Sequence, residues 1–119
     1  MYLVRNGALK ILTIGGGSGQ YTLLSGLRDI KTIEVTAIAS MADNGGSTGR
    51  LRNELGVLPP GDILKCVIAL SPIRDTAKKI MLKTLKSDRR LQGHKAGNLL
   101  IAMLSSYTGS FPAAIQTLS

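Results

Sequence analysis

The feature that most constrains the fold is a short apolar run that ends in a cluster of glycines. Residues 10–14 read Lys-Ile-Leu-Thr-Ile, and residues 15–19 read Gly-Gly-Gly-Ser-Gly. A β-branched apolar run of this length predicts a buried strand, and the glycines predict a tight turn directly after it. Glycine also lets a ligand approach the backbone, because no side chain covers the amide groups. The start of the chain therefore predicts either a plain strand-to-helix turn or a phosphate-binding one.

Helical and strand patterns alternate after this turn. Within residues 20–30, leucines and isoleucines recur at helical spacing, and residues 32–39 again have the pattern of a strand. The order strand, turn, helix, strand predicts a βαβ unit. We therefore predict an α/β fold, a Rossmann-like parallel sheet with flanking helices. Since only two strands are convincing and so small a sheet is not stable alone, we expect residues 1–119 to be the N-terminal part of a single larger domain.

Further helices are predicted downstream. Residues 58–61 (Leu-Pro-Pro-Gly) predict a hard turn, and Asp62 is well placed as the N-cap of the next helix, through Leu70. A helix over residues 73–86 would place Lys79, Lys83 and Lys86 on one polar face. The remaining predicted helices cover residues 97–106 and the segment opened by Ser110-Phe111-Pro112.

Positive charge is concentrated in the second half of the chain. The net charge is +8; residues 1–62 carry six basic and five acidic side chains, whereas residues 63–119 carry nine and two. This half should prefer anionic partners such as phosphates, nucleic acid or acidic lipid, unless the lysines form a solvated helix face. The chain has no Trp and few other aromatics, so a stacking platform for single-stranded nucleic acid is disfavoured.

The sequence favours a cytoplasmic protein. Cys66 is the only cysteine, which precludes an internal disulfide and suits a reducing compartment. The longest apolar stretch, Leu99–Leu104, is far shorter than the roughly 20 residues of a membrane-spanning helix. Residues 1–7 show no signal-peptide cleavage pattern. We expect no membrane span.

The first glycine-rich segment, residues 15–19, is suited to anion binding. It lies between a predicted strand and a predicted helix, where backbone N–H groups and the helix dipole favour a phosphate. It matches neither the dinucleotide fingerprint G-x-G-x-x-G nor a Walker loop, since no Gly-Lys pair is present. Residues 15–19 therefore predict contact with a phosphate, although they match neither of these known motifs.

A second candidate loop, residues 43–50, reads Asp-Asn-Gly-Gly-Ser-Thr-Gly-Arg. Its hydroxyls and the Arg50 guanidinium suit phosphate, and Asp43 suits a ribose hydroxyl or a Mg²⁺ that bridges phosphates. Because it follows a predicted parallel strand, it should lie where open α/β sheets bind ligands. The alternative is a flexible surface loop with Asp43 capping a turn.

A third candidate loop, residues 93–98, contains the only histidine, His94. His94 could bind a phosphate or act as an acid or base, but a hydrogen-bond role at a helix entry is the alternative. One histidine and one cysteine exclude a zinc cluster. The candidate ligand-binding residues of the three loops are Gly15, Gly16, Gly17, Ser18, Gly19, Asp43, Asn44, Gly45, Gly46, Ser47, Thr48, Gly49, Arg50, His94, Gly97 and Asn98.

Taken in order, these loops resemble the gluconeogenesis factor (YvcK-type) family, a branch of the CofD-like superfamily. The resemblance rests on residues 14–19, 42–52, 58–62 and 93–99, and it covers nearly the whole chain from Lys10 onward. Two positions depart from the family pattern: Asn44 stands where a second carboxylate is usual, and Lys95 stands where a serine is usual. The change at Asn44 weakens a metal site built on paired carboxylates.

The resemblance implies a Rossmann-like fold and a nucleotide-linked ligand, a UDP-sugar in this branch. It also implies a regulatory role in carbon metabolism, cell shape and envelope synthesis. The sister branch resembles 2-phospho-lactate transferases, which use a nucleotide diphosphate donor with Mg²⁺, and a basic nucleic-acid-binding module is the third alternative. We expect a small-molecule nucleotide ligand, no nucleic acid, and Mg²⁺ held by Asp43 rather than Asp62; homo-oligomerisation stays open.

Overall fold

The computed structural model describes residues 2–5, 7–42, 45–56, 58–86 and 89–119. Strands β2 (Ala8–Gly15) and β3 (Ile33–Ala39) are parallel, in a register that runs from Leu9 opposite Ile33 to Gly15 opposite Ala39. Helix α1 (Gly17–Leu27) joins them, so the predicted βαβ unit is confirmed. The sequence analysis missed a third strand, β1 (Tyr2–Arg5), which pairs antiparallel with β2 at its outer edge.

Five further helices lie in the described part of the chain: α2 (Gly46–Leu55), α3 (Gly61–Leu70), α4 (Arg74–Met81), α5 (Ala96–Thr108) and α6 (Phe111–Leu118). Helix α6 begins as predicted, with Ser110 as the N-cap that accepts a hydrogen bond from the backbone N–H of Ala113. Two predictions were wrong. The second loop is largely the helix α2, and α4 ends at Met81 instead of continuing to Lys86.

The early end of α4 removes the predicted lysine face. Lys83 and Lys86 lie beyond the helix, in a segment that turns back and pairs Thr84 with Lys95. The backbone N–H of Leu85 donates to the carbonyl of His94 at 2.9 Å, and that of Gly93 donates to the carbonyl of Leu85 at 3.0 Å. These tertiary hydrogen bonds outweigh the local helical periodicity and place the third candidate loop directly before α5.

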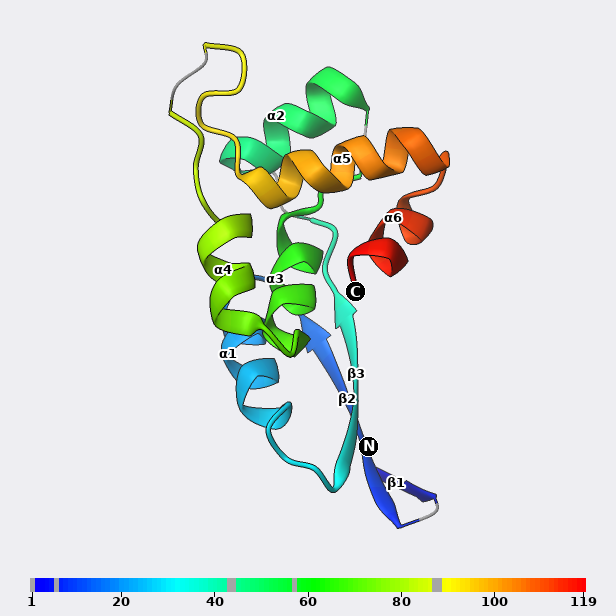
Figure 1. Ribbon diagram of the computed structural model, residues 1–119. Helices are drawn as coiled ribbons and strands as arrows, with labels where there is room; N and C mark the ends of the chain where they lie inside the picture. Colours follow the sequence, from blue (N-terminus) through cyan, green and yellow to red (C-terminus); the bar gives the residue numbers. More distant parts are fainter. Residues whose placement is uncertain (1, 6, 43–44, 57, 87–88) are drawn as a thin grey trace.

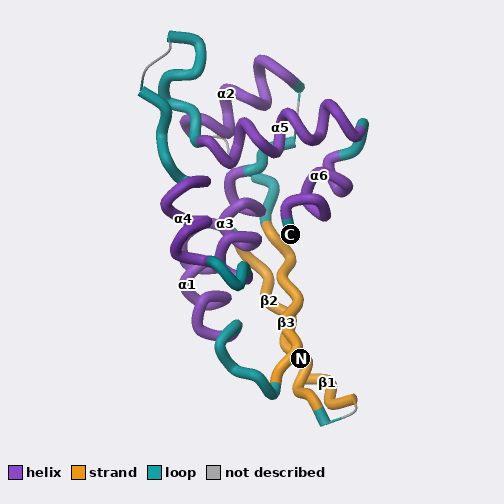
Figure 2. The backbone as a smooth tube through the Cα atoms, viewed as in Figure 1, coloured by secondary structure: helices purple, strands orange, loops and turns teal. Residues whose placement is uncertain are grey.

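The helices α1 and α3 cover one face of the sheet (Figures 1 and 2). Leu24, Cys66 and Ala69 are buried there against Val35 and Ala37 of β3. A second core, formed by Leu64, Ile68 and Ile101, joins α3 to α5 and α6. Helices α2 and α5 lie beyond the carboxyl ends of β2 and β3 (Figure 1). The other face of the sheet leaves Leu12, Ile14 and Ile38 exposed.

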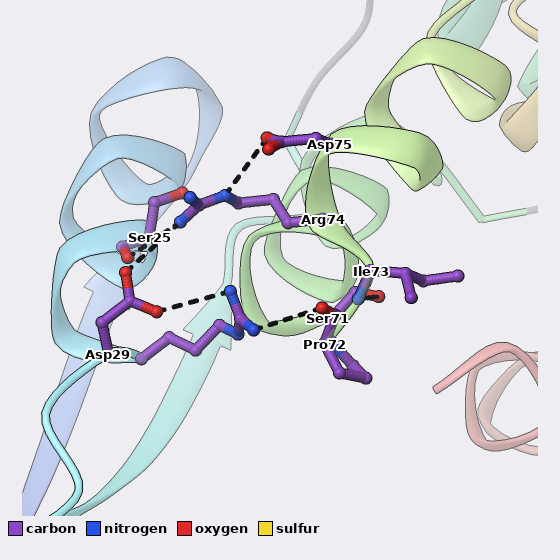
Figure 3. A network of polar contacts seen from close by, with 8 residues as sticks. Ser25, Asp29, Ser71, Pro72, Ile73, Arg74 and Asp75 are labelled. Atoms are coloured by element: carbon purple, nitrogen blue, oxygen red, sulfur yellow. Dashed lines mark hydrogen bonds and ion pairs between the residues drawn. The ribbon is translucent and has the colours of Figure 1, made fainter.

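Two arginines tie the C-terminal end of α1 to the start of α4 (Figure 3). Arg28 donates through Nη2 to the carbonyl of Pro72 at 3.3 Å, and Arg74 donates through Nη1 to the carbonyl of Ser25 at 3.1 Å. Asp29 lies within ion-pair distance of both, at 3.4 Å from Arg28 and 3.9 Å from Arg74. The network therefore fixes α4 against α1.

Within the described residues, none of the helices combines the length and the apolar character that crossing a bilayer demands.

Candidate functional site

The first glycine-rich segment lies at the carboxyl end of the parallel strands. Gly15 ends β2, Gly16 is the extended N-cap of α1, and Gly17 opens the helix with a φ of 67°. Helix α1 has no side-chain cap and no acidic residue in its first turn. Its first N–H groups therefore receive no acceptor from α1 itself, which is the electrostatic setting in which helix ends bind anions.

A carboxylate from another helix faces this turn. A Cβ on Gly16 would collide with Oδ2 of Asp62 and would lie 3.0 Å from Cβ of Ser40, and a Cβ on Gly17 would lie 4.0 Å from Oδ1 of Asp62. Asp62 is buried, and its Oδ1 is 3.6 Å from Nζ of Lys65. A side chain at position 16 would therefore displace the Asp62 carboxylate from the turn.

The predicted capping role of Asp62 was wrong. Helix α3 begins at Gly61 with Pro60 as its N-cap, so Asp62 lies inside the first turn and makes no side-chain cap. Its side chain is free to turn toward α1 because Pro60 already occupies the cap position. Asp43 and Asn44 lie outside the described residues, so the expectation that Asp43 holds Mg²⁺ stays a prediction.

The side chain of Gln20 links the glycine-rich turn to β2 and β3, a role that was not predicted from the sequence. Its Nε2 donates to Oγ1 of Thr13 at 3.1 Å and to the carbonyl of Ile38 at 3.4 Å. A Cβ on Gly15 would lie 3.2 Å from Oε1 of Gln20. The available signal was the position of Gln20, four residues before Leu24 and so on the buried side of the helix, since buried amides have hydrogen-bond partners.

The second and third candidate loops come together in a buried polar cluster of Ser47, Thr48, His94 and Asn98. Oγ of Ser47 is 3.0 Å from Nδ1 of His94. It accepts from the backbone N–H of Lys95 at 3.1 Å and from Nδ2 of Asn98 at 3.2 Å. Nδ2 of Asn98 also donates to Oγ1 of Thr48 at 3.3 Å. All four side chains are buried, so the cluster locks the start of α2 to the start of α5.

Hydrogen-bond counting assigns the tautomer of His94. The hydroxyl of Ser47 has two acceptor sites, and both are used by N–H donors. With Nδ2 of Asn98 facing Ser47, the hydroxyl proton is assigned to the bond with Nδ1 of His94, which makes this nitrogen the acceptor and places the ring proton on Nε2. Oδ1 of Asn98 has no hydrogen-bond partner among the described residues.

Two other candidate residues have packing contacts in this structure. Nη1 of Arg50 donates to the carbonyl of Gln92 at 2.6 Å, and its Nε is 3.6 Å from Glu54. Gly97 is buried where a Cβ would lie 2.7 Å from Leu64 and 3.0 Å from Met81. Arg50 therefore holds the loop before α5, and Gly97 lets α5 approach α3; ligand contacts from either residue stay predictions.

The candidate residues thus form two groups. The segment 15–19 joins Asp62, and the segment 45–50 joins residues 93–98. Gly19 and Gly46 show no crowding that would require glycine through close packing, although Gly46 has a φ of 46°. Within the described residues, no three side chains of His, Cys, Asp or Glu gather closely enough to hold a metal ion.

Cys66 lies below the turn and should be unreactive. Burial raises the pKa of its thiol, and the negative charge of Asp62 raises the pKa further, while a hydrogen bond with Gln20 and the charge of Lys65 lower it. The thiolate is the nucleophile, so we expect iodoacetamide at pH 8 to alkylate Cys66 far more slowly than a free thiol. Mass spectrometry measures the rate, and rapid alkylation in urea is the control. Rapid modification of the folded protein would contradict this prediction.

Comparison with known proteins shows the family to which this chain belongs. The family model described as 2-phospho-L-lactate transferase CofD matches residues 11–119. A Thermotoga maritima protein is 44% identical over 110 residues, and the gluconeogenesis factor of Bacillus subtilis is 42% identical over the same length. Both alignments cover 92% of this chain, but 35% and 34% of those relatives.

A solved structure gives the same result. A crystal structure of a Bacillus halodurans protein matches with a TM-score of 0.83 at 39% identity, over 92% of this chain and 35% of that chain. The chain thus spans about a third of the length of the relatives that it matches.

Proposed function

Because this chain belongs to the CofD family, we propose that it forms part of the ligand site of a nucleotide-sugar-binding regulator. The proposed ligand is a UDP-sugar or a similar nucleotide diphosphate, bound together with Mg²⁺. The proposed role is the regulation of carbon metabolism, cell shape and envelope synthesis. The metabolic part is supported by the relative from Bacillus subtilis, which is named gluconeogenesis factor.

The observation that carries this proposal is the uncapped N-terminus of α1 beyond the end of β2. Gly16 offers no side-chain acceptor to the helix, and the extended and left-handed glycines expose the backbone of the turn. Helix α2 also begins without a side-chain cap, at Gly45. A helix that begins at the carboxyl edge of a parallel sheet without a side-chain cap presents its first N–H groups in the setting that suits a diphosphate.

Asp62 supports the inclusion of a divalent cation. A phosphate bound at Gly16 and Gly17 would lie beside the Asp62 carboxylate, and two anions in a partly buried site repel each other. Mg²⁺ is commonly bound by one or two carboxylates together with substrate phosphates. Asp62 would supply one such carboxylate, and Asp43 is the proposed second.

Asp62→Asn tests the proposal. The change keeps the side-chain volume but removes the charge, so with Mg²⁺ present we expect the affinity for a UDP-sugar to fall about tenfold or more, by loss of an ionic ligand of the cation. Without Mg²⁺ we expect the variant to bind as well as the wild type or better, because the repulsion is gone. Isothermal titration calorimetry of the full-length protein measures both affinities.

Two comparisons complete this test. Asp43→Asn tests the prediction from the sequence that Asp43 holds Mg²⁺. Asp29→Asn is the matched control, because Asp29 lies at the far end of α1. The apo melting temperature should change little in Asp62→Asn, since Asn keeps the side-chain volume and the 3.6 Å separation from Lys65 is too long for a hydrogen bond. If Asp62→Asn leaves the Mg²⁺-dependent affinity unchanged while Asp43→Asn abolishes it, Asp62 is not a ligand.

A second candidate function is a transferase that uses a nucleotide diphosphate donor and Mg²⁺. It is favoured by the family model, whose description is 2-phospho-L-lactate transferase. The two functions differ in turnover. Release of nucleoside monophosphate that requires both Mg²⁺ and an acceptor would establish the transferase, whereas saturable binding without release supports the regulator.

A further inference from the structure

A separate pocket opens between α1, α3 and α4. Its volume is about 280 Å³, near the lower end of the roughly 300–1,000 Å³ that drug-sized ligands occupy. The lining residues are Ser18, Tyr21, Thr22, Lys65, Lys78 and Leu82. Two of them are lysines from different helices and none is acidic, so the pocket is positively charged and suits a small anion.

The two ammonium groups differ in how they are held. Nζ of Lys78 lies 5.2 Å from the ring centroid of Tyr21, a cation–π contact between two residues that line the pocket. Lys78 forms no ion pair with a described carboxylate. Lys65 is 3.6 Å from Oδ1 of Asp62 and keeps its remaining N–H donors. A bound dianion would attract the ammonium groups of Lys65 and Lys78, which otherwise repel each other.

The wall formed by α1 adds a hydroxyl and a helix end. Ser18 is in the first turn of α1, where the dipole favours negative charge. Thr22 donates its hydroxyl proton to the carbonyl of Ser18 at 3.0 Å, so of these two hydroxyls Ser18 has the proton that an anion can accept. The pocket thus combines two lysines from different helices with a hydroxyl donor from the first turn of α1.

The walls of the pocket are held in place. The Arg28 and Arg74 network fixes α4 against the C-terminal end of α1 (Figure 3). Leu82, directly after α4, closes the pocket on its apolar side. The helices that carry Tyr21 and Lys78 are therefore fixed relative to each other, which lowers the cost of ordering the pocket when a ligand binds.

We propose that this pocket binds the phosphoryl group of a small molecule, either inorganic phosphate or a phosphate monoester, at a site separate from the nucleotide. A phosphate fits better than a single carboxylate because its two charges and its several oxygens match the two lysines and the Ser18 hydroxyl. The pocket shares Ser18 with the glycine-rich segment but none of residues 15–17. Its size admits a small phosphate ester and not a nucleotide sugar.

The test is a calorimetric titration of the full-length protein with inorganic phosphate and with glycerol 3-phosphate, at constant ionic strength. We expect saturable binding, weakened about tenfold or more by Lys78→Gln through loss of a charge-assisted contact. Lys78→Arg should retain binding because it keeps both the charge and the contact with Tyr21. The two ligands distinguish a free phosphate from an ester.

Lys79→Gln is the matched control, since it removes the same charge from the same helix outside this pocket. Equal weakening by Lys78→Gln and Lys79→Gln would show diffuse attraction and would overturn the proposal. Competition between phosphate and a UDP-sugar would overturn the separation of the two sites. Phosphate binding that persists in a protein with no affinity for UDP-sugars would support this pocket even if the proposed nucleotide function fails.

Discussion

Gly17→Val is expected to lower the affinity for a UDP-sugar about 10- to 100-fold, from the 1–3 kcal/mol cost of overfilling a fitted site. The φ of Gly17 is 67°, a backbone conformation that costs other residues roughly 1–2 kcal/mol. Valine would also place a branched side chain where the phosphate approaches the first N–H groups of α1. Calorimetry measures the affinity, and urea denaturation measures the stability.

Gly109→Val separates strain from binding. Gly109, the C-cap of α5, has a φ of 69° and nothing within 4 Å of an added Cβ. It should lose the same roughly 1–2 kcal/mol of stability as Gly17→Val and keep its ligand affinity. Equal loss of UDP-sugar affinity in both variants would show that the effect is global and would remove the support for a phosphate at the turn.

Charge variants address the nucleic-acid alternative. Replacing Lys79, Lys83 and Lys86 together by Ala should leave UDP-sugar affinity nearly unchanged, since distant exposed charges are screened by salt. If duplex DNA were the ligand, each lost phosphate contact would reduce the log–log salt slope by about 0.9. Duplex binding tighter than nucleotide binding, abolished in this variant but not in Gly17→Val, would overturn the proposed function.

Ser47→Ala is expected to destabilise the protein by about 2–4 kcal/mol, because it leaves buried groups without a partner. The lost hydroxyl serves Nδ1 of His94, the backbone N–H of Lys95 and Nδ2 of Asn98. Of these three groups, Nδ2 of Asn98 alone keeps another partner among the described residues, Oγ1 of Thr48. Urea denaturation of the wild type and the variant gives the difference in unfolding free energy.

Ser106→Ala is the control for this change. Ser106 is exposed within α5, so its replacement should alter stability by about 0.5 kcal/mol at most. The comparison also decides the role of the cluster. A stable Ser47→Ala protein that has lost UDP-sugar affinity would make Ser47 a ligand contact instead of a link between α2 and α5.

The local pattern of residues 8–39 determined the parallel βαβ unit. A strand, a glycine turn and an amphipathic helix are each specified by neighbouring residues, so periodicity and backbone freedom were sufficient to place β2, α1 and β3. The same holds for the start of α6, where Ser110 and Pro112 are cap and first-turn residues. Strand β1 also had a local signal that went unused, since Tyr-Leu-Val-Arg is followed by Asn6-Gly7, a dipeptide typical of two-residue hairpin turns, directly before β2.

Tertiary contacts decided which chemical groups meet. The residue Asp62 suited an N-cap by sequence, yet packing of α3 on α1 turns its carboxylate toward Gly16. Similarly, Ser47 and His94 are 47 positions apart, and their hydrogen bond depends on the docking of α2 against α5. Lys79, Lys83 and Lys86 have helical spacing, but α4 ends at Met81 and the segment after it pairs Thr84 with Lys95. Such pairings carry no local signal, because the free energy that selects them comes from residues distant in the chain.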